Sequence, residues 1–242
     1  MKALLFAAGR GERMRPLTDT VPKPLLTVGG HRLIEWHLKR LVAAGMREVV
    51  INIAHLAAQF PATLGDGERY GVHIDYSREG AEPLETGGGM LHALPLLGAA
   101  PFLAVNADTF TDFDFAELPR EPAGVAELVL VENPPQHPQG DFGIDAHGRL
   151  LPWPGAPRAV HALTFAGIGL YRPEILRNWK DCIGADPSAA DGPPRFSITP
   201  LLRAAIARGE IAWRVHRGIW TDVGTPERLA ALDATLAHGN PP

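Results

Sequence analysis

The sequence predicts an α/β fold with a mostly parallel central sheet, helices on both faces and a smaller mixed sheet in its second half. Three observations indicate this architecture. A short apolar strand from Lys2 to Ala8 runs directly into a glycine-rich turn. Strand and helix patterns then alternate up to about residue 116, which is typical of βαβ units. From about Glu117 onward, strand-like runs are separated by short proline-rich loops instead.

The elements of the first half follow from the spacing of apolar residues. Between His31 and Gly45 these residues recur at helical intervals, and Gly45 is a typical helix end. Three later runs have the composition and length of buried strands, at 48–53, 72–76 and 101–105. Two helical patterns lie between them, at 55–64, which a proline interrupts, and at 86–97, which opens with glycines.

The second half is predicted to contain shorter elements. We expect a strand at 126–131 and a helix near 198–208. The connecting loops are short and stiff because they are rich in proline, at 133–138, 152–155 and 184–194. A terminal helix is predicted at 225–236, with Thr225 as its N-cap and Pro226 in its first turn.

The composition excludes several classes of protein. With 242 residues, of which 45% are hydrophobic, the chain is long enough for one large domain. A net charge of −4 argues against nonspecific nucleic-acid binding. Cys182 is the only cysteine, which excludes an intrachain disulfide and a cysteine-based zinc site. No leader pattern opens the chain, and no apolar run approaches the roughly 20 residues of a membrane helix. We therefore expect a cytoplasmic protein that binds neither nucleic acid nor membranes.

The segment from Gly9 to Lys23 has the composition of an anion-binding loop. Its glycines allow backbone N–H groups to approach a phosphate, and its arginines and Lys23 supply positive charge. A Walker A loop would need Gly-Lys-Ser/Thr, which is absent. A dinucleotide fingerprint would need a glycine at Met14 and an acidic residue near Ile53, and neither is present. The plainer alternative is a tight surface turn with ordinary basic residues.

Two aspartates are candidate metal ligands. Asp108 follows a predicted strand at the same sheet edge as the glycine-rich turn, so it could hold a divalent cation against phosphates. Asp222 precedes the terminal helix. Either residue alone could simply cap a turn or a helix. Together they suit Mg²⁺, which usually takes one or two carboxylates and leaves the remaining positions to phosphates and water.

A run of three glycines, Gly87 to Gly89, opens the predicted helix at 86–97. Glycines in a helix cost conformational entropy, so the backbone there is expected to approach another group closely. One candidate is the face of a nucleobase, with Thr86 contributing to its recognition. The alternative is tight packing of the helix against a neighbouring segment.

The run from Gly9 to Thr18, Gly-Arg-Gly-Glu-Arg-Met-Arg-Pro-Leu-Thr, followed by Pro-Lys-Pro-Leu at 22–25, resembles the signature of sugar-1-phosphate nucleotidyltransferases. The resemblance extends from Met1 to about Leu236. Within that family it is strongest to the bacterial N-acetylmuramate-1-phosphate uridylyltransferases of peptidoglycan sugar recycling. It implies a Rossmann-like nucleotidyltransferase fold and a Mg²⁺-dependent enzyme. That enzyme would join UTP to N-acetylmuramate 1-phosphate and release pyrophosphate.

The resemblance also implies a role for each part of the chain. Residues 1–242 would form a single domain, with a nucleotide-binding half at 1–116, a sugar-binding half at 117–224 and a C-terminal helix at 225–238. Arg15 and Lys23 would be catalytic, and Asp108 and Asp222 would bind the metal. The expected nucleotide-binding residues are Ala8, Gly9, Gly11, Glu12, Arg13, Lys23, Glu79, Glu85, Thr86 and Gly87. The expected sugar-binding residues are Asn106, Asp141, Gly143 and Phe165.

One departure from the family leaves alternatives open. Many relatives carry a Glu-Lys-Pro triplet whose lysine helps hold the sugar phosphate, and this chain has none. The candidate substitutes are Arg158, Arg195 and Arg217. A guanylyl- or cytidylyltransferase acting on heptose, mannose or phosphocholine substrates remains possible, as does a catalytically silent nucleotide-binding regulatory protein. Oligomeric state is not predictable from the sequence.

Overall fold

The computed structural model describes residues 1–184 and 193–238. The predicted loop at 184–194 therefore lies largely outside the described residues. Within them, nine strands form one sheet: β1 (Lys2–Phe6), β4 (Glu48–Ile53), β5 (His73–Arg78), β6 (Phe102–Asn106), β8 (Ala126–Val131), β9 (Phe142–Asp145), β10 (Leu150–Leu151), β11 (Ala159–Tyr171) and β12 (Ile211–Val215). Two small pairs stand apart: β2 (Thr27–Val28) with β3 (His31–Arg32), and β7 (Thr109–Thr111) with β13 (Trp220–Asp222).

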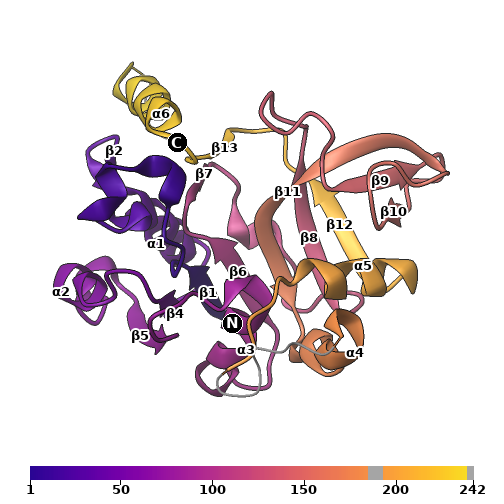
Figure 1. The fold of residues 1–242 in the computed structure, drawn as a ribbon, viewed down its shortest axis with the longest axis horizontal. Helices are drawn as coiled ribbons and strands as arrows, with labels where there is room; N and C mark the ends of the chain where they lie inside the picture. Colours follow the sequence, from indigo (N-terminus) through magenta and orange to yellow (C-terminus); the bar gives the residue numbers. More distant parts are fainter. Residues whose placement is uncertain (185–192, 239–242) are drawn as a thin grey trace.

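The sheet is parallel in the first half of the chain and mixed in the second. Strands β5, β4, β1 and β6 lie side by side and parallel. The long strand β11 then pairs antiparallel with β6, β8 and β9, while β12 is parallel to β8. The predicted parallel sheet and mixed second half are confirmed. The second half is not a separate sheet, because β11 joins it to the first half without a break (Figure 1).

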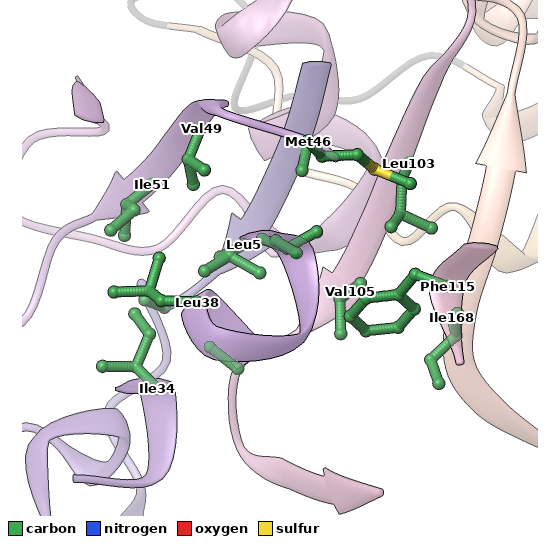
Figure 2. Packing of buried hydrophobic residues seen from close by; sticks show 14 of the residues in the cluster. Leu5, Ile34, Leu38, Met46, Val49, Ile51, Leu103, Val105, Phe115 and Ile168 are labelled. Atoms are coloured by element: carbon green, nitrogen blue, oxygen red, sulfur yellow. The ribbon is translucent and has the colours of Figure 1, made fainter. Parts of the chain in front are cut away.

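Helices cover both faces of the parallel strands, as predicted. Six α-helices lie in the described residues: α1 (Leu33–Ala43), α2 (Gln59–Leu64), α3 (Glu85–Leu97), α4 (Trp179–Ile183), α5 (Thr199–Ala207) and α6 (Pro226–His238). Alternate strand residues point to opposite faces. Leu5 therefore packs with Leu38 of α1 on one face (Figure 2), while Leu4 packs with Met90 of α3 on the other.

Three helix starts can be compared with the prediction. The helix expected from His31 begins at Leu33, because His31 and Arg32 pair with β2 instead. The helix expected from His55 begins only at Gln59, since Leu56 has a left-handed backbone with φ 50°. For α6 the predicted N-cap is confirmed: Thr225 O accepts from the Leu229 N–H (3.0 Å).

Helix α6 returns from the end of the chain to the first half of the protein. Leu232 and Leu236 pack with Val28 and Trp36, and Figure 1 shows α6 beside β2. Just before α6, β13 pairs with β7. The segment at 220–224 therefore lies next to Asp108. Among the described residues, no helix is long and apolar enough to cross a membrane.

Candidate active site

The glycine loop, residues 9–15, follows the carboxyl end of β1. Gly11 has a left-handed backbone (φ 65°), and a Cβ at this position would lie 2.9 Å from Thr18 Cγ2. Thr18 Oγ1 in turn donates to Gly11 O (2.8 Å), which holds the loop in place. The N–H groups of residues 8–11 make no hydrogen bond within the described part of the chain. They are available to an anion, as the sequence predicts.

A first cavity of about 630 Å³ opens at this edge of the sheet. It contains eight of the ten residues that the sequence predicts for nucleotide binding: Ala8, Gly9, Gly11, Glu12, Arg13, Lys23, Glu85 and Thr86. Glu79 and Gly87 are not part of its wall, and neither is Arg15. The Arg15 side chain is exposed and pairs with Asp19 at 3.2 Å, so its catalytic role stays a prediction.

Lys23 and Asp108 meet at the inner end of the first cavity. Lys23 Nζ lies 2.6 Å from Asp108 Oδ2, and the lysine side chain is 8% exposed against 41% for the aspartate. A buried ammonium group is retained only where it is paired, so the carboxylate holds it in position. The pair places a positive and a negative group side by side where phosphates would arrive.

A second cavity, of about 240 Å³, shares Asn106 and Asp108 with the first. Asp222 lies on its wall, brought there by the pairing of β13 with β7. The Val223 N–H donates to Asp108 O (3.0 Å), so the two aspartates are held together by the backbone. The sequence predicted both residues, and the structure brings them to one cavity.

The two aspartates suit a hard divalent cation that is shared with a substrate. Their donors are oxygens, as Mg²⁺ prefers. The described residues contain no group of three or more His, Cys, Asp or Glu side chains that could hold a metal ion alone. Two carboxylates without a third protein ligand match a metal whose remaining ligands are phosphates and water.

Glu79 belongs to a buried network beneath the first cavity. Asn52 Nδ2 donates to Glu79 Oε1 (2.5 Å), and the Leu84 N–H donates to Oε2 (2.7 Å). Asn52 Oδ1 accepts from the Ala7 N–H (2.7 Å), which links this network to the end of β1. Burial raises the pKa of the Glu79 carboxyl. Glu79 thus positions the backbone around the cavity, and direct contact with nucleotide stays a prediction.

The three glycines of α3 are explained by packing. A Cβ at any of them would overlap a neighbouring group: Phe196 at Gly87, Pro194 O at Gly88, and Asn52 and Glu79 at Gly89. The N–H groups of Gly87 and Gly88 both donate to Phe196 O (2.9 and 3.0 Å). The alternative of tight packing therefore accounts for the run. Thr86, which lines the first cavity, remains the candidate for contact with a base.

The four predicted sugar-binding residues lie in three different places. Asn106 and Phe165 line the second cavity. Asp141 lies behind it, where Oδ2 accepts from the Phe165 N–H (2.8 Å) and Oδ1 is 3.1 Å from His137 Nε2. Gly143 packs instead against Trp153 O in the β9–β10 region. The structure brings the first two residues together and leaves Gly143 apart.

A β-bulge shapes the wall beside Asn106. The pairing of β11 with β8 shifts register between Phe165 and Ile168. Gly167, inside this bulge, has φ 73°, and a Cβ there would lie 2.5 Å from Asn106 Nδ2. Gly167 therefore leaves room for the Asn106 side chain beside the cavity.

Several wall residues were not predicted. Arg10 lines the first cavity and pairs with Glu82 at 2.5 Å across its rim. Arg195, one of the three candidate phosphate anchors, also lines it, whereas Arg158 lies in a separate cavity and Arg217 is exposed.

Gln136 lines the second cavity. The proline-rich loop that contains Gln136 was visible in the sequence, but nothing local indicated what it faces.

Comparison with known proteins agrees with this site. Residues 2–239 match the nucleotidyl transferase family. The chain is 47% identical over 239 residues to N-acetylmuramate alpha-1-phosphate uridylyltransferase of Neisseria meningitidis serogroup B, across 97% of each chain. It is 33% identical over 248 residues to the Caulobacter vibrioides protein of the same name, across 98% of this chain and 97% of that one.

A solved structure supports the fold. A Bacillus anthracis protein described as a glucose-1-phosphate thymidylyltransferase superposes with a TM-score of 0.80 over 100% of this chain and 97% of that chain, at 22% identity. The chain belongs to the nucleotidyl transferase family. The resemblance drawn from Gly9 to Thr18 and the expected Rossmann-like fold are therefore confirmed.

Proposed function

We propose that the protein joins UTP to N-acetylmuramate 1-phosphate, giving UDP-N-acetylmuramate and pyrophosphate. The observation that carries this proposal is that the two cavities meet at Asp108, where Lys23 of the first cavity pairs with it. A nucleoside triphosphate in the first cavity and a sugar 1-phosphate in the second would present their phosphates to the same two charged groups. The similarity to uridylyltransferases over nearly the whole chain supports the choice of UTP and of the sugar.

The reaction needs no nucleophile from the protein. An oxygen of the sugar phosphate attacks the α-phosphorus of UTP in line, and pyrophosphate leaves from the opposite side. Catalysis of such a transfer consists of alignment and charge neutralisation. The free N–H groups of residues 8–11 would bind the triphosphate, and Lys23 would reach the α-phosphate or the sugar phosphate. Arg15 would steady the leaving pyrophosphate.

Mg²⁺ is the proposed cofactor, held by Asp108 and Asp222. When bound, it would neutralise phosphate charge and orient the oxygens around the α-phosphorus. Asn106, which lines both cavities, would contact the sugar or the ribose. Phe165 would form part of the sugar wall, with Asp141 fixing its backbone. Peptidoglycan recycling and a cytoplasmic location remain predictions from the sequence.

The decisive experiment measures pyrophosphate release. ATP, CTP, GTP and UTP are each combined with N-acetylmuramate, N-acetylglucosamine, glucose and mannose 1-phosphates in the presence of Mg²⁺. The expected result is turnover with UTP and N-acetylmuramate 1-phosphate, with kcat/KM at least about tenfold above every other pair, a difference of about 1.4 kcal/mol in the transition state.

The other outcomes each point to a different function. Preference for GTP or CTP, or for another sugar phosphate, would identify a guanylyl- or cytidylyltransferase. Binding of UTP by calorimetry without pyrophosphate release from any pair would instead support a regulatory protein. Either result contradicts the proposal.

A further inference from the structure

Asp222 is held by two donors that reach one and the same oxygen. Arg228 Nη1 donates to Asp222 Oδ1 at 2.8 Å from the first turn of α6. Gln136 Nε2 donates to the same Oδ1 at 2.6 Å from the loop that lines the second cavity. Oδ2 accepts no hydrogen bond within the described part of the chain. The two oxygens of this carboxylate therefore differ, because one is occupied and the other is open.

The contact between Arg228 and Asp222 passes close to the backbone of Gly224. A Cβ at Gly224 would overlap Arg228 Nη2 and would lie 3.1 Å from Asp222 Oδ2. The guanidinium is also mostly buried, with a side chain 20% exposed, and its Nε has no hydrogen-bond partner among residues 1–184 and 193–238. Burying an unpaired N–H group costs free energy. The contact with Asp222 is therefore maintained despite a cost in stability.

The number of oxygens that a carboxylate offers affects the choice of metal. Ca²⁺ accepts a carboxylate through one oxygen or both, in a large and flexible shell, whereas Mg²⁺ requires a small, nearly octahedral shell. A carboxylate with one oxygen already occupied by two donors cannot chelate through both oxygens. Such a ligand suits Mg²⁺ better than Ca²⁺.

We propose that Arg228 and Gln136 are positioning residues that hold Asp222 as a one-oxygen ligand and thereby favour Mg²⁺ over Ca²⁺. The inference rests on the proposed function, because it takes Asp222 as a metal ligand. Arg228 and Gln136 act through Asp222 and need not touch the metal. They come from different parts of the chain, so the preference depends on the folded arrangement of α6 and the loop at 133–138.

The test measures displacement of Mn²⁺ from the full-length protein by Mg²⁺ and by Ca²⁺, followed by the electron paramagnetic resonance signal of free Mn²⁺. Both competitors carry the same charge, so the ratio of their dissociation constants changes little when a nearby cation is altered. It reports the geometry of the ligands instead. The test variants are Gln136→Ala, which changes no charge, and Arg228→Lys, which keeps the charge.

Two matched controls accompany them. Gln139→Ala removes an exposed glutamine directly after that loop, whose side chain makes no hydrogen bond to the described residues. Arg177→Lys alters an exposed arginine in a surface pair with Glu174. The ratio is expected to shift toward Ca²⁺ by about fivefold in Gln136→Ala and about tenfold in Arg228→Lys, a change of the size of one ordinary hydrogen bond's net contribution. The controls should match the wild type.

Asp222→Asn separates the two ways in which the idea can fail. If this variant binds Mn²⁺ as tightly as the wild type, Asp222 is not a metal ligand and that part of the proposed function is wrong. If it loses Mn²⁺ while Gln136→Ala and Arg228→Lys keep the wild-type ratio within about twofold, only the positioning role is overturned. Should Arg228→Lys fold poorly, Gln136→Ala decides alone, because Gln136 lies on an exposed loop.

Discussion

The two cavities meet at Asp108, yet their walls are built in different ways. The first cavity is formed largely by the glycine loop and the ends of neighbouring parallel strands, supported by the buried contact between Asn52 and Glu79. The second depends on the bulge at Gly167, the loop at 133–138 and the return of β13. The first cavity, the proposed phosphate side, is therefore assembled mostly within the first half of the chain. The second cavity, the proposed sugar side, requires pairing between remote segments.

The largest effect is expected at the junction itself. Because Asp108 lines both cavities and Lys23 pairs with it, Lys23→Ala and Asp108→Asn should each lower kcat by about 10²- to 10³-fold, as for the loss of a preorganised transition-state contact. The KM values for UTP and for the sugar phosphate separate binding from chemistry. Lys39→Ala, which changes an exposed lysine on α1, is the control. Near-normal turnover at saturating Mg²⁺ in Asp108→Asn would contradict the metal assignment.

A change at the bulge should affect the second cavity more than the first. In Gly167→Ala the left-handed backbone costs about 1–2 kcal/mol, and overlap with Asn106 adds about 1–2 kcal/mol. We expect stability to fall by about 3 kcal/mol in urea unfolding. The KM for the sugar phosphate should rise, and the KM for UTP should rise less, because Asn106 also lines the first cavity. An equal rise in both KM values would show that the two walls are not independent.

The pH dependence of stability tests whether His37 is buried in its neutral form beside the strand that follows Asp108. His37 Nε2 lies 2.7 Å from Thr109 O and ties α1 to β7, which follows Asp108. Burial lowers the pKa of His37 from 6.5 to about 4. As the pH falls, the unfolded chain binds a proton first, so stability is full above about pH 6.5 and declines toward pH 4.

Between pH 7 and pH 5 this histidine should account for a loss of about 2 kcal/mol in the free energy of unfolding. His37→Gln keeps an N–H donor of similar reach but does not titrate. Urea unfolding at both pH values should therefore show a smaller loss in the variant than in the wild type. Equal losses would mean that His37 is not buried in its neutral form.

The smallest of these effects is expected on the phosphate side. In Gly89→Ala, overlap with Asn52 and Glu79 costs about 1–3 kcal/mol, while the gain in helix propensity returns up to about 1 kcal/mol. A net loss of about 1–2 kcal/mol should appear in urea unfolding, with a rise in the KM for UTP. Gly155→Ala, where a Cβ meets no atom within 4 Å, is the matched control. If Gly89→Ala were more stable than the wild type, the contact between Asn52 and Glu79 would have rearranged at little cost.

The sequence predicted site residues that lie in short local segments better than those placed by contacts between remote segments. Lys23 and Asp108 were predicted from the short segments that contain them, and the structure pairs their side chains at 2.6 Å. Gly143 was expected in the sugar site but packs against Trp153, because strand composition does not show which face a residue occupies. Gln136 and Arg228 carried no local signal, since their contact with Asp222 exists only after remote segments meet.

The sequence by itself determined the alternation of strands and helices, the anion-binding character of the glycine loop and the family. These depend on apolar periodicity and on the chemistry of a few adjacent residues, which are local properties of a chain. The tertiary structure decided that β11 joins both halves in one sheet, and that Asp222 lies beside Asp108 with one oxygen occupied. These depend on contacts between residues far apart in the sequence, which no local pattern specifies.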